Sequence, residues 1–184
     1  AATFSLGSAD RIEVLRGPLS ALYGNASGGL IQIFTADGPP VPEAGGEFWS
    51  GAYGSARLSL RAAGESGRLN YRADTARFST GGYRDHSAAT RDHGNARLKI
   101  GLGDGSRLSL VLNALNQADT QDPLGLTRAQ VAANPRQADP ATTLFNTRKS
   151  IGQTQVGTTW GRRLANGDSL RLSLYGGARD VTQH

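Results

Sequence analysis

Cysteine and methionine are absent from this 184-residue sequence, and lysine occurs only twice, as Lys99 and Lys149. The lack of cysteine excludes a disulfide framework and metal sites built on thiolates. No run of about 18 apolar residues occurs, so a transmembrane helix is not expected. The chain also begins without the charged region and apolar core of a signal peptide. We therefore expect a processed protein or a fragment of a larger one.

Apolar side chains are scarce as well. Hydrophobic residues make up 38% of the sequence and aromatic residues 7%, whereas glycine occurs 25 times. A core packed from two sides normally requires a larger apolar fraction. A membrane-spanning β-barrel with a water-filled interior needs apolar side chains on only one face of each strand. The composition therefore favours a barrel wall over an ordinary soluble domain.

The formal net charge is +5, and arginine supplies nearly all of the positive charge. A basic chain raises nucleic-acid binding as a candidate function. The arginines do not cluster in the sequence, however. They alternate with apolar residues, as in the segment RLSLR at residues 57–61. This alternation is typical of the polar face of a strand, so no nucleic-acid partner is expected.

The first 35 residues predict a small unit with two strands. Residues 11–15 alternate between polar and apolar types, and residues 30–34 form a second, more apolar segment. Between them, Gly17 and Pro18 signal a turn, and residues 19–22 are long enough for one helical turn. The expected order is therefore strand, turn, helix, loop and strand.

From residue 46 onward, polar and apolar residues alternate with a period of two, which is the pattern of strands with two different faces. Leu108, Leu110 and Leu112 show it clearly, and five other segments repeat it. With a short strand from Glu47, we count seven strands. Seven is below the roughly eight strands of the smallest usual barrels, and lipid does not tolerate unpaired sheet edges. We therefore expect these strands to belong to a larger barrel.

The links between the predicted strands fall into two classes by length. Short links are expected at residues 64–67, 103–105 and 165–168, where glycine, asparagine and aspartate favour tight hairpins. On the other side, we expect a first link at residues 53–55 and long links at residues 81–92 and 119–148. In the longest link, Thr127 could cap a short helix over residues 128–133. Outer-membrane barrels show this asymmetry, with short links facing the periplasm and long links facing outside.

Three segments near the N-terminus carry a family resemblance. Residues 9–18 (ADRIEVLRGP), 22–25 (LYGN) and 28–31 (GGLI) resemble the closing motif of the plug domain in TonB-dependent outer-membrane receptors. The motif stands directly before the barrel-like strands, where that family requires it. Later segments are similar to the YncD branch of the family, also called PqqU. They are residues 54–55, 82–87, 95–98, 134–137, 146–149 and 153–155.

The resemblance implies a mainly β fold, as part of a plugged 22-stranded antiparallel transmembrane β-barrel. Residues 1–38 are expected to be the C-terminal part of the α/β plug domain. Residues 39–46, rich in proline and glycine, are expected to be a linker. Residues 47–184 would then form about the first seven strands of the barrel. The Ton box and the ligand-facing plug loops would lie upstream, so this polypeptide alone is not expected to transport a ligand.

Receptors of this family bind scarce ligands outside the cell and admit them with energy from the inner-membrane TonB–ExbB–ExbD complex. The resemblance implies a receptor in the outer membrane of a Gram-negative bacterium, in contact with its lipid and with TonB. A ferric siderophore or another iron complex is the expected ligand, and pyrroloquinoline quinone or another non-iron ligand is the alternative. A passive porin-like channel and a soluble all-β binding module are rivals from other classes. No catalytic constellation is present, so neither enzyme activity nor a cofactor is expected.

The plug motif supplies the first set of candidate residues. They could form part of a moving gate, or the glycines and Pro18 could simply shape a tight turn. Glu13 and Arg16 could also pair with opposite charges on the barrel wall. The candidate gating residues are Arg11, Glu13, Arg16, Gly17, Pro18, Tyr23, Gly24, Gly28 and Gly29.

A repeated Asp-His pair, at residues 85–86 and 92–93, supplies the second set. Two histidines and two carboxylates could hold a transition metal, or they could belong to a solvated loop. The neighbouring arginines could contact an anionic ligand. The ligand-facing candidates are Tyr83, Arg84, Asp85, His86, Arg91, Asp92 and His93.

Two further predictions concern the wall. Several arginines are expected to face the lumen, either to steer a ligand or to line a wet wall: Arg57, Arg61, Arg72, Arg97, Arg107 and Arg171. Trp160 stands beside a short link and is predicted to belong to an aromatic girdle at the membrane interface.

Overall fold

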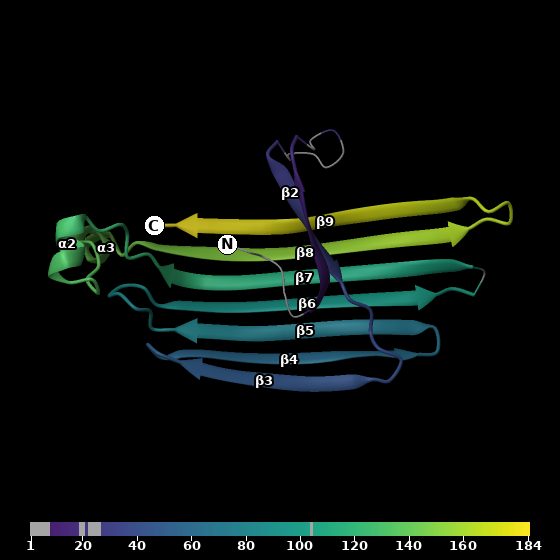
Figure 1. Cartoon of the computed structure of the whole chain (residues 1–184), viewed down its shortest axis with the longest axis horizontal. Coiled ribbons are helices and arrows are strands. Elements are labelled where there is room, and N and C mark those ends of the chain that lie inside the picture. The colour runs from purple at the N-terminus through teal and green to yellow at the C-terminus, as the bar shows by residue number, and fades with distance from the viewer. Residues whose placement is uncertain (1–7, 19–20, 22–26, 104) are drawn as a thin grey trace.

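The computed structural model describes residues 8–18, 21, 27–103 and 105–184. They form two separate antiparallel sheets (Figure 1). The smaller sheet is a hairpin of β1 (Ala9–Arg16) and β2 (Gly29–Thr35). The larger sheet has seven strands, the number that the alternation predicts. They are β3 (Glu43–Gly51), β4 (Ser55–Ser66), β5 (Leu69–Thr80), β6 (Ala89–Gly101), β7 (Ser106–Gln121), β8 (Arg148–Arg163) and β9 (Ser169–Gln183).

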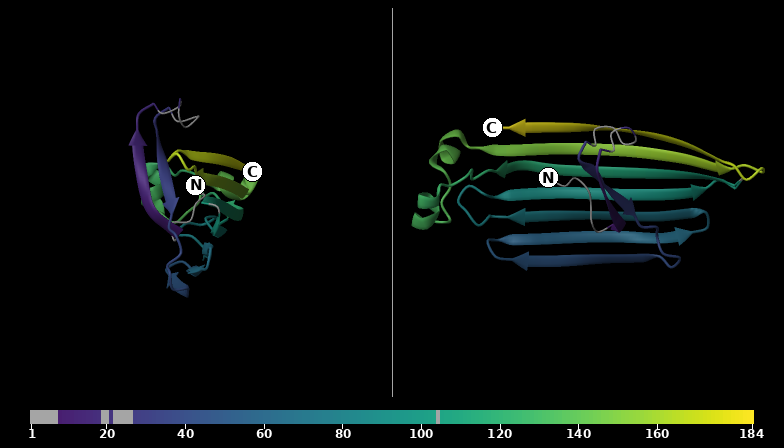
Figure 2. Two further views of the ribbon diagram at one scale, coloured as in Figure 1. Left: turned by 90° about the vertical axis from the view of Figure 1, so that its right-hand side faces the viewer. Right: turned by 45° about the horizontal axis from the view of Figure 1, so that its top comes forward.

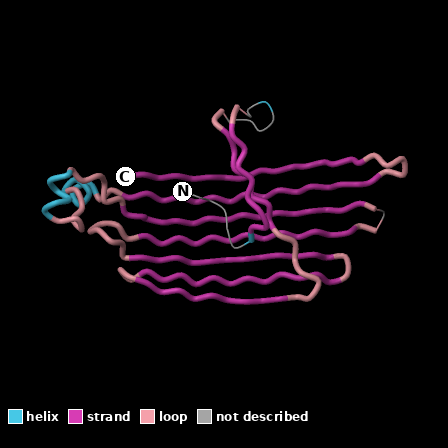
Figure 3. The backbone as a smooth tube through the Cα atoms, viewed as in Figure 1, coloured by secondary structure: helices cyan, strands magenta, loops and turns pink. Residues whose placement is uncertain are grey.

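The larger sheet is a simple meander in which each strand pairs with its neighbours in the chain. Figure 3 shows the long strands running side by side, with a link at each end. The first strand of the larger sheet starts earlier than predicted. This strand, β3, begins at Glu43 and includes four residues that the sequence assigns to the linker. Its first half contains Ala44, Gly45 and Gly46, which pair with residues 60–62 of β4. These residues have small side chains or none, so they show no alternation of polar and apolar types.

The hairpin lies over one face of the larger sheet, which we call the inner face (Figures 1 and 2). Arg97, Lys99, Arg107 and Arg171 line the same space as hairpin residues, so they project from the inner face. The strand register places Arg57, Arg61 and Arg72 on this face too. The predicted lumen-facing arginines therefore share one face of the sheet.

Most of the outer face is apolar and exposed, with Arg77 and Asp92 as a charged pair on it. Leu58, Leu112 and Leu172 are 49, 43 and 57% exposed. The few buried hydrophobic residues in the described part of the chain are Ala63, Ala76, Leu115 and Ile151, and the register places all four on the inner face. A soluble sheet would bury its leucine-rich face in a core. This sheet has the opposite distribution, with apolar residues outside and polar residues inside, as in the wall of a transmembrane barrel.

The two long links lie at one end of the sheet, together with the short link between β3 and β4 (Figure 1). Short links follow β4, β6 and β8, and we call this the short-link end. Residues 52–54, 81–88 and 122–147 form the links at the other end, the long-link end. In the first of them, Tyr53 and Gly54 both have positive φ, and Ser55 N donates to Ala52 O at 3.1 Å, which closes a tight turn.

Two of the predicted long links are shorter than expected. The link at 81–92 ends at residue 88, because Thr80 and Ala89 already pair and β6 begins there. Arg91, Asp92 and His93 consequently lie in a strand and not in a loop. The link predicted to begin at residue 119 begins at 122, because β7 continues to Gln121 with an irregularity between Gln117 and Thr120.

The longest link contains two short helices. The predicted helix is present as α2 (Arg128–Ala133), with Thr127 and Gln130 forming a capping box. A second helix, α3 (Pro140–Phe145), was not predicted, although Asp139 caps it and Pro140 occupies its first turn, a common start signal. In the described part of the chain, no helix has the length and apolar character needed to cross a bilayer.

The hairpin confirms the two strands predicted in the first 35 residues. Gly17 and Gly29 flank its loop with φ values of +112° and +135°. A Cβ on Gly29 would lie 2.5 Å from the carbonyl oxygen of Leu15, so glycine is required there. Tyr23, Gly24 and most of the predicted helical turn at 19–22 lie outside the described residues.

Candidate functional site

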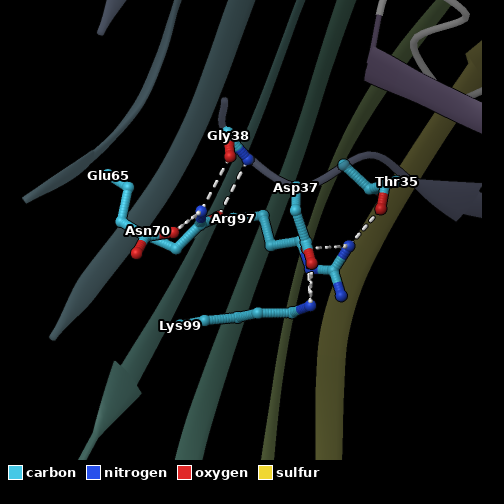
Figure 4. A network of polar contacts seen from close by, with 7 residues as sticks. All are labelled: Thr35, Asp37, Gly38, Glu65, Asn70, Arg97 and Lys99. Carbon is cyan, nitrogen blue, oxygen red and sulfur yellow. Dashed lines mark hydrogen bonds and ion pairs between the residues drawn. The ribbon is translucent and has the colours of Figure 1, made fainter. Parts of the chain in front are cut away.

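The segment that leaves the hairpin forms the main contact with the inner face. Residues 35–38, which we call the exit segment, begin at the last residue of β2 and cross β6 and β5 before the chain reaches β3 (Figure 4). Polar groups of Asn70, Arg97 and Lys99 contact the exit segment. We call five residues of this contact the anchor: Asp37, Gly38, Asn70, Arg97 and Lys99. Two of these residues belong to the exit segment, and the other three belong to β5 and β6 of the larger sheet.

Asp37 binds two cations of β6. Lys99 Nζ lies 2.5 Å from Oδ1 and 2.6 Å from Oδ2 of Asp37, and Arg97 Nη1 lies 3.3 Å from Oδ1. Arg97 also donates a hydrogen bond to the carbonyl oxygen of Thr35. Arg97 and Lys99 are two residues apart in one strand, so both side chains project from the same face. The charges of the wall therefore hold the exit segment at two points.

The ionisation of Asp37 reflects this arrangement. Burial raises the pKa of its carboxyl group. The hydrogen bond and charge of Lys99, with the charges of Arg97 and Arg107, act in the opposite direction and together hold the pKa below its ordinary value of 3.8. Asp37 is consequently a carboxylate at neutral pH, and the anchor contains a charged carboxylate with two cationic partners.

Gly38 is held through its backbone. Its N–H donates to Asn70 Oδ1 and its carbonyl oxygen accepts from Asn70 Nδ2, each at 2.8 Å. Asn70 Nδ2 also donates to Glu65 Oε2 at 3.2 Å. A Cβ on Gly38 would lie 2.4 Å from the carbonyl oxygens of both Gly64 and Tyr71. Only glycine allows the exit segment to approach the backbone of the wall this closely.

Pairing of Glu13 or Arg16 with charges on the barrel wall stays a prediction. In the described structure Glu13 Oε1 lies 2.7 Å from Arg11 Nε, two residues away on the same strand. The guanidinium of Arg11 also stacks over the ring of Phe34, 4.0 Å from its centroid. Arg16 lies at the end of β1, opposite Gly29. The contacts of Arg11 and Glu13 in the described structure are therefore within the hairpin, and a gating role of these residues stays a prediction.

The anchor was only partly predictable. Arg97 was expected to face the lumen, whereas Asp37, Gly38, Asn70 and Lys99 were not singled out. The sequence Ala-Asp-Gly at residues 36–38 has the composition of a turn. A signal was present in the alternation, which places Asn70 and Lys99 on the same face as the arginines.

The ligand-facing candidates in the second link are engaged in holding the long-link end together. Arg84 donates from Nε to Gln137 O at 2.9 Å, from Nη1 to Leu124 O at 2.7 Å and from Nη2 to Pro123 O at 2.9 Å. Its guanidinium thus connects the link at 81–88 to the link at 122–147. Each of these hydrogen bonds joins a charged donor to a carbonyl, a strong class of contact.

Other residues of this link make similar cross-connections. His86 Nε2 lies 2.8 Å from Thr147 O, and Asp85 N donates to Arg136 O at 2.8 Å. The rings of Tyr83 and Tyr53 meet edge to face with centroids 5.3 Å apart. The guanidinium of Arg136 lies within 6 Å of both rings, at 5.6 and 5.9 Å from their centroids. The three links at the long-link end therefore form one connected platform.

The two Asp-His pairs do not come together as a metal site. Asp92 and His93 are consecutive in β6, so their side chains project from opposite faces. Asp92 Oδ1 lies 3.5 Å from Arg77 Nε of the neighbouring strand, while Asp85 and His86 lie in the link. Across the described ranges, no group of three or more histidine and carboxylate residues is placed to hold a metal ion.

Trp160 projects from the outer face of β8, between Leu108 and Leu172 of the neighbouring strands. It lies three residues before the end of the strand at the short-link end. Membership of an aromatic girdle stays a prediction.

No family model matches the sequence. The ferripyoverdine receptor of the outer membrane of Pseudomonas aeruginosa, in its crystal structure with ferripyoverdine, matches with a TM-score of 0.69 and 17% identity. The match covers 92% of this chain and 24% of the receptor. FpvAI in its complex with pyocin S2 matches with a TM-score of 0.70, 19% identity, and coverage of 92% and 23%. The chain thus spans about a quarter of these structures and shares the fold of that part of the ferripyoverdine receptor.

Proposed function

We propose that this chain forms the end of the plug and about the first seven strands of the barrel in a TonB-dependent outer-membrane receptor. One observation carries the proposal. A hairpin is anchored to the polar face of a long antiparallel meander whose other face is apolar and exposed. A plugged barrel needs both features, because the plug must be held inside a wall that contacts lipid outside.

The proposed ligand is a ferric siderophore or another iron complex. This rests on the resemblance of the plug motif and on the fold shared with a receptor whose structure contains ferripyoverdine. Energy would come from TonB with ExbB–ExbD, acting on parts of the plug outside this chain. Pyrroloquinoline quinone remains the alternative ligand that the similarity to the YncD branch suggests.

A passive porin is the rival function. A porin needs an open lumen, whereas here the hairpin lies over the inner face and the exit segment is fixed to two strands of the wall. A soluble all-β module is disfavoured by the exposed leucines, which would leave a large apolar surface in water.

The full-length parent protein allows a direct test. Cells that express it should take up radiolabelled iron from at least one member of a panel of ferric siderophores, and deletion of TonB should abolish that uptake. Labelled pyrroloquinoline quinone is measured in parallel. Uptake that persists without TonB would favour the porin, and TonB-dependent uptake of the quinone alone would favour the alternative ligand.

A further inference from the structure

A pair of charged residues interrupts the outer face near the long-link end. Arg77 of β5 and Asp92 of β6 are directly opposite each other, with Leu58 of β4 and Asn116 of β7 as the next members of that row. The chain itself supplies the neighbouring strands on both sides of the pair. Further strands of a larger barrel would be added next to β3 and β9, so they would not cover this part of the outer face.

The position of Arg77 along β5 places it near one boundary of the apolar band. The outer-face residues of β5 are uncharged from Leu69, at the short-link end, to Thr75. Eight residues separate Leu69 from Arg77, which is about 27 Å along an antiparallel strand. At the roughly 40° tilt of strands in transmembrane barrels, this length spans roughly 20 Å of a bilayer whose apolar band is about 25 Å tall. In the proposed orientation, Arg77 therefore lies at the level of the lipid headgroups on the external side.

The guanidinium of Arg77 is exposed and only loosely paired. Its Nε lies 3.5 Å from Asp92 Oδ1, and 68% of the side chain is exposed. That separation is longer than the roughly 2.7–3.2 Å of an N–H···O hydrogen bond. A stronger acceptor with several anionic oxygens could therefore take the guanidinium over from Asp92.

Two hydroxyl groups stand beyond Arg77 on the same face. Ser79 follows Arg77 by two residues in β5, and Thr90 of β6 is directly opposite Ser79. Directly opposite side chains are about 5 Å apart, and those two residues apart in one strand are about 7 Å apart. The long side chain of Arg77 can thus reach a group held between the two hydroxyls. We call Arg77, Ser79 and Thr90 the headgroup patch.

We propose that the headgroup patch binds the phosphate of an anionic lipid in the outer leaflet of the membrane. The guanidinium fork matches two phosphate oxygens, and the hydroxyls can donate to a third. The acyl chains would lie along Leu58 and Leu60 of the neighbouring strand, which are 49 and 53% exposed. This inference rests on the proposed function, because it takes the outer face to be the face that meets lipid, and it adds a defined partner and site.

Diphosphoryl lipid A is a suitable probe, because it combines two headgroup phosphates with acyl chains. Purified full-length protein in detergent is titrated with it, and bound lipid is counted by native mass spectrometry. The same glycolipid without its phosphates is the comparison and should bind at least about fivefold more weakly, since one arginine at a membrane surface contributes about that factor. Arg77→Gln should weaken binding of diphosphoryl lipid A by a similar factor, and S79A/T90A by a smaller one. The control Arg179→Gln removes an inner-face arginine at the same end and should bind as the unmodified protein does.

A second measurement does not depend on variants that might misfold. Phenylglyoxal modifies accessible arginines, and diphosphoryl lipid A should protect Arg77 in the unmodified protein while leaving Arg128, an exposed residue of α2, reactive. Equal affinities of Arg77→Gln and Arg179→Gln, or equal binding of the glycolipid without phosphates, would overturn the proposal. Equal protection of Arg77 by inorganic phosphate would assign the patch to a free anion and would overturn it too. These measurements need neither a siderophore nor TonB, so their failure is distinct from a failure of TonB-dependent uptake.

Discussion

Asn70 holds the backbone of Gly38 with both ends of its side-chain amide, accepting from the N–H and donating to the carbonyl oxygen at 2.8 Å each. The amide thus replaces the pair of hydrogen bonds that a neighbouring strand would supply. Gly38 is not part of a strand, yet its backbone groups are satisfied and the residue is buried. The exit segment is therefore fixed at the point where the hairpin passes to the wall.

Replacement of Gly38 by alanine should displace the exit segment, because the new Cβ would lie 2.4 Å from two carbonyl oxygens of the wall. Overpacking of this kind costs about 1–3 kcal/mol. Amide hydrogen exchange at residues 35–38 of the full-length protein should accelerate accordingly. Gly28→Ala is the matched control, since a Cβ there would meet nothing within 4 Å. Unchanged exchange in the Gly38 variant would contradict the close approach described here.

The anchor should also weaken in acid. The pKa of Asp37 is lower in the folded protein than its ordinary value of 3.8, because the cations of the wall outweigh the effect of burial. The carboxylate therefore contributes stability fully above about pH 4, and this contribution is lost as the pH falls through the lowered pKa. The measurement is the difference in thermal stability between the unmodified protein and Asp37→Asn. This stability difference should be constant near neutral pH and should shrink below pH 4. A difference that grew in acid would contradict a lowered pKa of Asp37.

The strands were predictable because the two faces of the larger sheet differ in polarity. Polar side chains on the inner face and apolar side chains on the outer face give alternation with a period of two, visible in Leu108, Leu110 and Leu112. The signal fails where consecutive residues lack side chains, as at Gly45 and Gly46, so the predicted start of β3 at Glu47 is too late. It also fails at Arg91 to His93, where three polar residues in a row suggest a loop although the pairing with β5 continues.

The anchor was less predictable because its contacts depend on topology. Asn70 and Gly38 are 32 residues apart, and Asp37 and Lys99 are 62 apart. Alternation predicts that Asn70 and Lys99 project from the inner face, but it contains no information on where the exit segment crosses. Likewise, the sequence suggests that Arg84 contacts a ligand, whereas its guanidinium donates to the carbonyl oxygens of residues 123, 124 and 137. No local sequence pattern could identify these acceptors.

Removal of the Arg84 side chain should loosen the long-link end. Three carbonyl oxygens would lose a charged donor, and hydrogen bonds to charged groups are worth roughly 1.5–3 kcal/mol where they are shielded from solvent. We expect Arg84→Ala to increase the rate of limited proteolysis within residues 122–147 by about tenfold or more. Arg128→Ala removes an exposed arginine from α2 in the same link and should leave the rate unchanged. Equal proteolysis rates in the Arg84 and Arg128 variants would mean that the platform does not depend on Arg84.

Two adjacent residues of β8 test which face of the sheet meets lipid. Val156 projects from the outer face and is 52% exposed, whereas Gln155 borders the space under the hairpin. Both are near the middle of the strand. Arginine on the lipid face near the bilayer midplane costs roughly 2–4 kcal/mol, whereas the lumen face tolerates charge. In the full-length protein, Val156→Arg should therefore reduce assembly into the outer membrane and lower the unfolding midpoint in denaturant, and Gln155→Arg should change neither strongly. The membrane assignment would fail if Val156→Arg assembled normally, and the reverse ranking of the two variants would exchange the faces assigned here to lipid and lumen.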